Sequence, residues 1–190
     1  MPLKLAAIGA LGHMLSPAAR HLTEADPKPA HVCTVLDRGT SARLKETRRE
    51  AWKNQGATCV DSIQALLAPD DLDGLIICAG KNGDDIPLIE AALPILSQKR
   101  AFLLHCSTIS PRCVQHAHAL CTAHQVEYVN WPLTGGPKGA ETAQMLILAS
   151  GNPKLYERLL TLLNCLGQPK YFGDQLEQAA QIKLVGHTLV

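Results

Sequence analysis

Short apolar runs alternate with longer amphipathic segments along most of the chain. The runs are bounded by Gly, Asp, Asn, Ser or Pro, and this alternation is typical of strands separated by helices. The predicted strands are Leu3–Ile8, His31–Leu36, Gly56–Val60, Leu75–Cys78, Ala101–His105, Val126–Asn130, Gln144–Ala149 and Lys170–Phe172. Because Leu75–Cys78 is apolar throughout, it is expected to be buried on both faces of a parallel sheet. The pattern predicts an α/β fold, a mainly parallel sheet with helices on both faces.

The segments between the strands predict helices and loops. Helices are expected directly after Met14, over Ser41–Asn54, Asp61–Leu67, Asp84–Gln98 and Pro153–Cys165, and from Pro111 onward. The stretch Trp131–Gly139 is rich in Gly and Pro and is expected to be a loop. From Asp174 the pattern is helical up to Val190, so we expect one domain over residues 1–173 and the start of a long interdomain helix over residues 174–190.

Composition and charge narrow the classes of function. The formal net charge is +1, without the clustered Lys and Arg of a nucleic-acid-binding surface. The basic segment Arg43–Lys53 also contains acids and is interpreted as a solvated helix surface. No apolar run reaches the roughly 18 residues of a membrane span, and the N-terminus lacks the pattern of a signal peptide. The 7 cysteines form no CxxC pair, which indicates buried free thiols in a reducing cytoplasm. No histidines have the spacing of a metal site.

The stretch after the first strand is the first candidate site. It reads Gly9, Ala10, Leu11, Gly12, His13 and Met14. A strand, a glycine turn and a helix open a dinucleotide-binding unit, because glycines let the backbone approach a pyrophosphate. Gly12 is the second glycine of the motif, where the phosphate comes closest to the backbone, whereas Leu15 stands where a third glycine is usual. An ordinary strand-to-helix corner remains the alternative.

Residues at the ends of two further strands fit the same ligand. Asp37 follows the second strand, where an acid binds the adenosine ribose of NAD. The neighbouring Arg38 fits the 2′-phosphate of NADP instead, so the choice of cofactor stays open at this point. Ala79 and Gly80 follow the fourth strand and lie at the edge where ligands bind in such sheets.

Two later segments are candidates for binding a small substrate. Ser107 and Thr108 follow a strand and precede a helix that starts at Pro111, an arrangement that suits a carboxylate. Its alternative is a plain helix cap. The loop after Trp131 contains Thr134, Gly135 and Gly136, and adjacent glycines let a chain wrap closely around a ligand. Its alternative is a wide turn.

Together these motifs resemble the β-hydroxyacid dehydrogenase family, which includes 3-hydroxyisobutyrate dehydrogenases, glyoxylate/succinic-semialdehyde reductases and 6-phosphogluconate dehydrogenases. The resemblance rests on Gly12-His13-Met14, on Ser107-Thr108-Ile109-Ser110-Pro111, on Pro132 to Ala140 and on Gln181-Ile182-Lys183-Leu184. These motifs occur in the order of the family and span almost the whole chain. The resemblance implies a Rossmann-type domain and an NAD(P)-dependent oxidoreductase that moves hydride between nicotinamide and a small hydroxyacid or aldehyde acid.

The resemblance also implies roles for individual residues. Lys183 would be the catalytic acid and base, and Ser107, Thr108, Thr134, Gly135 and Gly136 would bind the substrate. Ser107 would also lie against the cofactor. His187 stands where the family usually has Asn; it would either contact the substrate through a hydrogen bond or mark an altered specificity. The segment Arg38-Gly39-Thr40 is similar to that of NADP users, so we expect NADP in preference to NAD.

The departures from the family leave two alternatives open. Relatives continue into an all-helical domain that forms a dimer and closes the substrate pocket, and this sequence lacks that domain, so a homodimer is expected only where it exists. One alternative is a non-catalytic dinucleotide-binding or dimerisation module. The other is an enzyme similar to imine reductases, although Lys183 argues against it, because that group usually carries another residue there.

Overall fold

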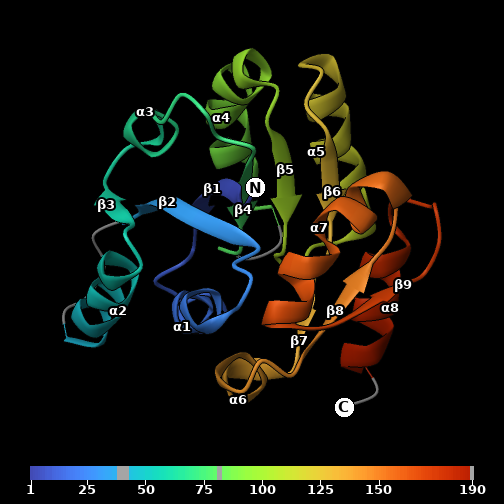
Figure 1. Ribbon diagram of the computed structural model, residues 1–190. Coiled ribbons are helices and arrows are strands. Elements are labelled where there is room, and N and C mark those ends of the chain that lie inside the picture. Colours follow the sequence, from blue (N-terminus) through green and yellow to red (C-terminus); the bar gives the residue numbers. More distant parts are fainter. Residues whose placement is uncertain (38–42, 81–82, 189–190) are drawn as a thin grey trace.

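The computed structural model describes residues 1–37, 43–80 and 83–188. A six-stranded parallel sheet lies at the centre of the fold (Figure 1). The sheet has the strand order β3-β2-β1-β4-β5-β6. Its strands are β1 (Leu3–Ile8), β2 (Ala30–Leu36), β3 (Thr58–Val60), β4 (Gly74–Ile77), β5 (Phe102–His105) and β6 (Tyr128–Asn130). Ile77 pairs with Ile8 on one side and with His105 on the other, so the central strands end together at one edge. The predicted α/β fold of Rossmann type is confirmed.

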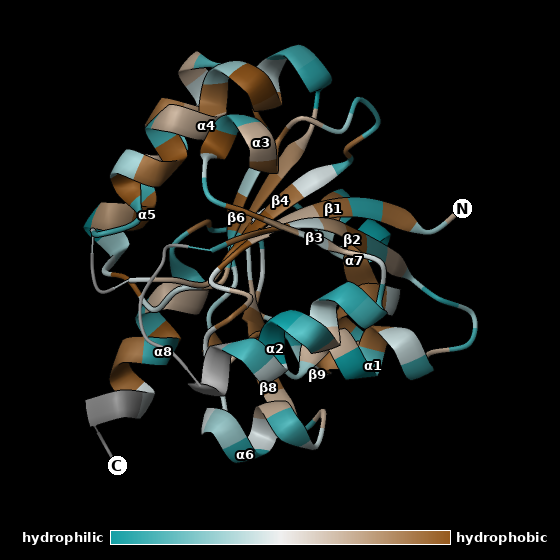
Figure 2. Ribbon diagram, turned by 90° about the vertical axis from the view of Figure 1, so that its left-hand side faces the viewer, coloured by the Kyte–Doolittle hydropathy of each residue, from teal (hydrophilic) through white to brown (hydrophobic). Residues whose placement is uncertain are grey.

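Helices cover both faces of this sheet, as expected. The helices beside it are α1 (Ala18–Glu24), α2 (Arg43–Asn54), α3 (Ile63–Leu66), α4 (Ile86–Lys99), α5 (Pro111–Ala123) and α7 (Pro153–Leu166). Buried residues of α1, α2 and α7 belong to one apolar core, and those of α3, α4 and α5 belong to a second core. Figure 2 shows α3, α4 and α5 on one side of the strands and α1 and α2 on the other. No helix in these ranges is long and apolar enough to cross a membrane.

A second sheet, which the sequence analysis did not separate from the first, holds the later strands. It consists of β7 (Leu133–Thr134), β8 (Met145–Ala149) and β9 (Gly167–Tyr171), with β7 antiparallel and β9 parallel to β8. The expected loop Trp131–Gly139 was wrong, because it contains β7 and the start of α6 (Gly136–Glu141). The last strand begins earlier than predicted, at Gly167, where a Cβ atom would come within 2.0 Å of the Met145 carbonyl oxygen.

The first helix also begins later than predicted. The chain from Ala10 to Pro17 forms successive turns, and α1 starts only at Ala18. Pro17 explains this delay, because its ring disfavours the helical conformation for the residue before it. The glycine turn and the helix are therefore separated by several residues.

Trp131 connects the two sheets. Its backbone N–H donates to the His105 carbonyl oxygen at the end of β5 over 2.9 Å, and its indole N–H donates to the Ser150 carbonyl oxygen after β8 over 2.8 Å. The Ser150 hydroxyl in turn accepts the Ala179 N–H of α8 (Gln178–Thr188). The indole is fully buried against Tyr156, with ring centroids 5.7 Å apart. This chain of contacts fixes where α8 lies relative to the large sheet.

Candidate functional site

The carboxyl edge of the parallel sheet brings most of the predicted site residues together. The turn that begins at Gly9 follows β1, Asp37 follows β2, Gly80 follows β4, and Ser107 follows β5. The chain goes from β1 to β2 on one side and reaches β4 on the other, so the strand order reverses beside β1. Open parallel sheets bind ligands at such a reversal point.

The glycine turn is shaped by close packing. Gly9 has φ +83°, and a Cβ atom there would lie 2.0 Å from the Cys78 carbonyl oxygen, so a side chain at this position would force β1 and β4 apart. The Gly12 N–H donates to the Gly9 carbonyl oxygen over 2.8 Å and closes the turn. Leu15 is buried in the core at the position where the usual motif has its third glycine.

Helix α2 holds this turn from the side. The Trp52 indole N–H donates to the Ala10 carbonyl oxygen over 2.9 Å, and the Arg48 guanidinium donates to the Leu11 carbonyl oxygen over 2.8 Å. Arg48 also lies 3.0 Å from Nδ1 of His13, which is exposed. The interpretation of Arg43–Lys53 as a solvated surface was therefore wrong for Trp52 and Arg48, whose spacing by four residues on one helix face is the signal that sequence reasoning missed.

Asp37 forms an ion pair that the sequence did not reveal. Nε and Nη2 of Arg49 lie 2.6 Å and 2.5 Å from one carboxylate oxygen of Asp37. The hydrogen bond to Asp37 is the largest cause of a raised pKa for Arg49. Asp37 lines a hollow of about 450 Å³ together with Cys59, Val60, Asp61 and Ala65. Arg38 lies outside the described residues.

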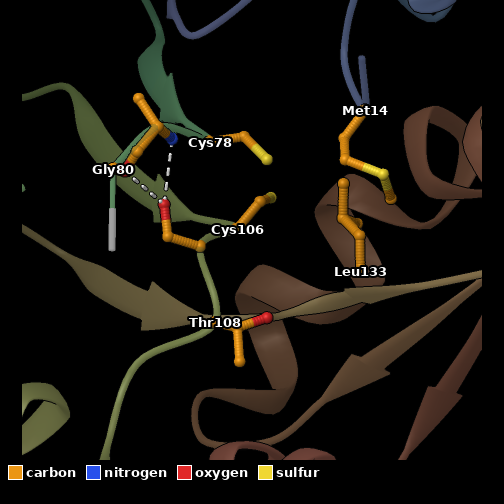
Figure 3. Close-up of a pocket in the computed structure, with 8 residues that line it drawn as sticks. Met14, Cys78, Gly80, Cys106, Thr108 and Leu133 are labelled. Carbon is orange, nitrogen blue, oxygen red and sulfur yellow. Dashed lines mark hydrogen bonds between the residues drawn. The ribbon is translucent and has the colours of Figure 1, made fainter. Parts of the chain in front are cut away.

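A second hollow, of about 250 Å³, lies at the ends of β4 and β5. Its lining consists of Met14, Cys78, Ala79, Gly80, Cys106, Ser107, Thr108 and Leu133. Figure 3 shows Met14 and Leu133 across from Cys78 and Cys106. Burial raises the pKa of Cys78 to about 12 and raises that of Cys106 as well, so both thiols are neutral. The cavity wall is thus largely uncharged, which suits a planar aromatic ring.

The Ser107 hydroxyl joins two strand ends. It accepts the Ala79 N–H over 3.0 Å and donates to the Ala79 carbonyl oxygen over 3.0 Å, as the dashed lines in Figure 3 show. The Asn130 side chain donates to the carbonyl oxygens of His105 and Ser107 and fixes the same segment from β6. Ser107 therefore shapes the cavity wall through its backbone neighbours. Thr108, which is half-buried, belongs to the same wall.

Lys183 lies on α8 against the second sheet. Its ammonium group donates to the Thr134 hydroxyl over 2.8 Å, and the residue is only 5% exposed. Burial lowers its pKa below the ordinary 10.5, which moves a lysine toward the range of a general acid or base. Thr134 directly follows Leu133, which lines the cavity, whereas Lys183 itself is not part of the lining.

The paired glycines lie on the loop that Lys183 contacts through Thr134, whereas His187 lies on the same helix as Lys183. Gly135 and Gly136 have φ +127° and +61° and begin α6 directly after Thr134. A Cβ atom on Gly136 would meet nothing within 4 Å, so there is open space beside the loop that follows Thr134, the residue that Lys183 contacts. His187 lies on α8 one turn after Lys183, but its side chain is outside the described part.

Next to Gly80, which lines the cavity, three buried polar side chains contact one another in a row that the sequence analysis did not anticipate. Nε2 of His105 lies 2.9 Å from an oxygen of Asp85, and its Nδ1 lies 3.1 Å from the Tyr128 hydroxyl. All three residues are at most 4% exposed. Gly80 is required beside them, because a Cβ atom there would come within 2.7 Å of the Asp85 carboxylate. The histidine within an apolar strand was the available signal. Among the described residues, no cluster of three or more His, Cys, Asp and Glu side chains is placed to hold a metal ion.

Comparison with known proteins identifies the family. Residues 4–182 match the sequence family described as the NAD binding domain of 6-phosphogluconate dehydrogenase. The chain belongs to this family. Its expected place among the β-hydroxyacid dehydrogenases is confirmed by relatives such as glyoxylate/succinic semialdehyde reductase 2, chloroplastic, of Arabidopsis thaliana, which is 28% identical over 186 residues, covering 92% of this chain and 46% of that protein.

Two further proteins illustrate the range of matches. NAD-dependent L-serine dehydrogenase of Pseudomonas aeruginosa is 28% identical over 172 residues, 87% of this chain and 52% of that protein. The imine reductase from Myxococcus stipitatus in complex with NADP+ superposes with a TM-score of 0.78 at 18% identity, over 99% of this chain and 61% of that one. This last likeness shows the fold. The chain spans about half the length of the curated relatives that it matches.

Proposed function

We propose that the carboxyl edge of the sheet binds NAD or NADP in an extended conformation across β1. The observation that carries this proposal is the position of the two hollows. One lies beside Asp37 and β3, the other at the ends of β4 and β5, and the turn from Gly9 to Gly12 lies between them in the strand order. A dinucleotide has the same sequence of parts, because its pyrophosphate joins two nucleosides.

The residues present fit such a ligand part by part. The hollow at Asp37 would hold the adenosine, and the largely uncharged cavity at Cys78 and Cys106 would hold the nicotinamide. The pyrophosphate would lie at the glycine turn, with Arg48 as the nearby positive charge. Arg48 suits this role because its guanidinium already donates to the Leu11 carbonyl oxygen within the turn.

We propose further that the whole protein is an NAD(P)-dependent oxidoreductase in which Lys183 transfers the proton. When bound, the nicotinamide supplies or accepts the hydride. Lys183 would give a proton to the substrate oxygen or take one from it, which its burial and lowered pKa support. Its hydrogen bond to Thr134 keeps the ammonium group beside the loop of Gly135 and Gly136.

The proposed substrate is a small hydroxyacid or aldehyde acid. The names of the two curated relatives, a glyoxylate/succinic semialdehyde reductase and an L-serine dehydrogenase, support this class. Its carboxylate would bind at Thr108 and the loop of Gly135 and Gly136, with His187 on the adjoining turn of α8. Ser107 would contribute by holding the wall in place, because its hydroxyl is engaged by Ala79. The division at residue 173, the cytoplasmic location and the homodimer stay predictions.

One observation favours the non-catalytic alternative. The glycine turn departs from the usual fingerprint at Leu15, which is buried where a glycine would let the helix approach the strand. A module that keeps the fold without binding a cofactor would tolerate this change. The retained, desolvated Lys183 weighs against that alternative, because burying an ammonium group without a function only lowers stability.

Calorimetric titration with NADH and with NADPH tests the proposal. We expect binding of at least one cofactor at millimolar concentration. Gly12→Val should weaken binding of both by about tenfold or more, since a Cβ atom there lies 2.9 Å from the Gly9 carbonyl oxygen and would distort the turn. Glu157→Ala, on the exposed side of α7, is the control and should leave both affinities unchanged. Absence of heat with either cofactor would contradict the proposal.

A further inference from the structure

We infer that Arg49 on α2 determines whether the adenosine hollow accepts the 2′-phosphate of NADP. This inference rests on the proposed function and adds a specificity-determining residue to it. Sequence reasoning placed the choice between Asp37 and Arg38. The structure adds a third group, because Asp37 does not face the hollow as an isolated carboxylate.

The contacts of Asp37 define the starting point. Its backbone N–H donates to the Val60 carbonyl oxygen over 2.7 Å, which fixes the residue at the end of β2 beside β3. Two nitrogens of Arg49 converge on one of its carboxylate oxygens, at 2.6 Å and 2.5 Å. The side chains of Asp37 and Arg49 are 17% and 24% exposed, so solvent screens this pair only partly.

An acid at this position normally selects NAD for two reasons. Its oxygens accept hydrogen bonds from the ribose hydroxyls, and its charge repels a 2′-phosphate. Here the guanidinium of Arg49 offsets that charge and occupies one of the two oxygens. Both reasons for excluding NADP are therefore weakened in this chain.

Arg49 also has donors to offer a phosphate. A guanidinium carries five N–H groups in a planar fork that matches phosphate oxygens. In the described part of the chain, the contacts to Asp37 and to Glu46, which lies 3.1 Å from Nη1, use three of them. Arg49 is not itself part of the lining of the hollow, but it contacts the lining residue Asp37, so a 2′-phosphate beside Asp37 would lie near a guanidinium that is already held in place.

The adjacent arginine supplies a matched comparison. Arg48 directs its guanidinium to the Leu11 carbonyl oxygen and to His13, at the turn where the pyrophosphate would lie. Both cofactors share the pyrophosphate, whereas only NADP carries the 2′-phosphate. Two neighbouring arginines on one helix are therefore expected to act on different parts of the ligand.

The experiment measures dissociation constants of NADH and NADPH by calorimetry for the unsubstituted chain and for Arg49→Gln, Arg49→Lys, Arg48→Gln and Asp37→Asn/Arg49→Gln. Arg49→Gln should weaken NADPH by about tenfold or more relative to NADH, because a charge-assisted contact is lost and Arg49 no longer offsets the negative charge of Asp37. Arg49→Lys should change the ratio less. The double variant should recover part of it, and Arg48→Gln should weaken both cofactors by the same factor.

Two fragments make the test independent of the nicotinamide. Adenosine 2′,5′-bisphosphate should lose affinity for Arg49→Gln, while adenosine 5′-monophosphate should not, and thermal unfolding of each variant verifies that it is folded. An NADPH-to-NADH ratio unchanged in Arg49→Gln and Arg49→Lys would overturn the inference alone. If the unsubstituted chain bound neither cofactor, the proposed function would fail and the inference with it.

Discussion

Replacing Gly9 by Ala tests whether this glycine serves the packing of the sheet. A Cβ atom at Gly9 would lie 2.0 Å from the Cys78 carbonyl oxygen, so β1 and β4 would have to separate. Overpacking of this kind costs about 1–3 kcal/mol. The left-handed backbone at φ +83° costs an alanine about 1–2 kcal/mol more.

Gly136→Ala is the matched control for this substitution. Gly136 also has a positive φ, +61°, but a Cβ atom there would meet nothing within 4 Å. The backbone cost and the loss of freedom in the unfolded chain are similar for the two variants. The difference between them therefore isolates the steric contact, and we expect Gly9→Ala to be less stable by about 1–3 kcal/mol.

Urea unfolding followed by circular dichroism gives the two free energies of unfolding. Cofactor affinity, measured on the same samples below the transition, should fall for Gly9→Ala and stay constant for Gly136→Ala, because only Gly9 lies under the proposed pyrophosphate position. If the two variants differed by less than about 0.5 kcal/mol, the close approach of β1 to the Cys78 carbonyl would not control stability, and the argument would be refuted.

Three further substitutions address the lysine, the cavity wall and a helix cap. Lys183→Met should lower turnover of small hydroxyacids by about a hundredfold to ten-thousandfold in a version that continues past Val190, without changing cofactor affinity; equal rates would remove the proposed acid and base. Since burial lowers the pKa of Lys183, this side chain binds its proton more strongly in the unfolded chain, so the stability of the unsubstituted chain relative to Lys183→Met should increase between urea unfolding at about pH 7 and about pH 10. Ser107→Ala removes two hydrogen bonds to Ala79 and should cost about 1–3 kcal/mol of stability, measured by denaturant unfolding. Asn152→Ala deletes the cap that accepts two N–H groups at the start of α7 and should cost about 1 kcal/mol, whereas no change in the thermal midpoint would contradict that role.

Local patterns predicted much of the fold, and contacts between distant segments explain the rest. The apolar run Leu75–Cys78 indicated a central strand because burial on both faces leaves no place for polar side chains. The second sheet was missed because β7 has only 2 residues, too few for a periodic signal. The glycine motif predicts a helix directly after Met14, whereas Pro17 disfavours the helical conformation at Ser16, so α1 begins only at Ala18.

The candidate site also contains residues that local motifs predicted and residues whose contacts depend on the folded structure. The glycine turn and Lys183 belong to motifs of recognisable order, so the sequence was enough to single them out. Arg49 lies 12 positions from Asp37, and their pairing depends on how α2 returns to the sheet. A charged residue on a helix has the same local pattern whether it faces solvent or a carboxylate, so the ion pair was not predictable from the sequence.

The contacts of Trp131 join the sheet that carries the adenosine hollow to the elements that carry Lys183. The adenosine hollow belongs to the large sheet, whereas Lys183, Thr134 and the cavity wall at Leu133 belong to α8 and the small sheet. Trp131 joins the two through its backbone on one side and its indole on the other. A change at Trp131 is expected to shift Lys183 and Leu133 relative to the large sheet while leaving the adenosine hollow unchanged. Substitutions around Lys183 can therefore alter the proposed proton transfer without altering the proposed choice between NAD and NADP at the adenosine hollow.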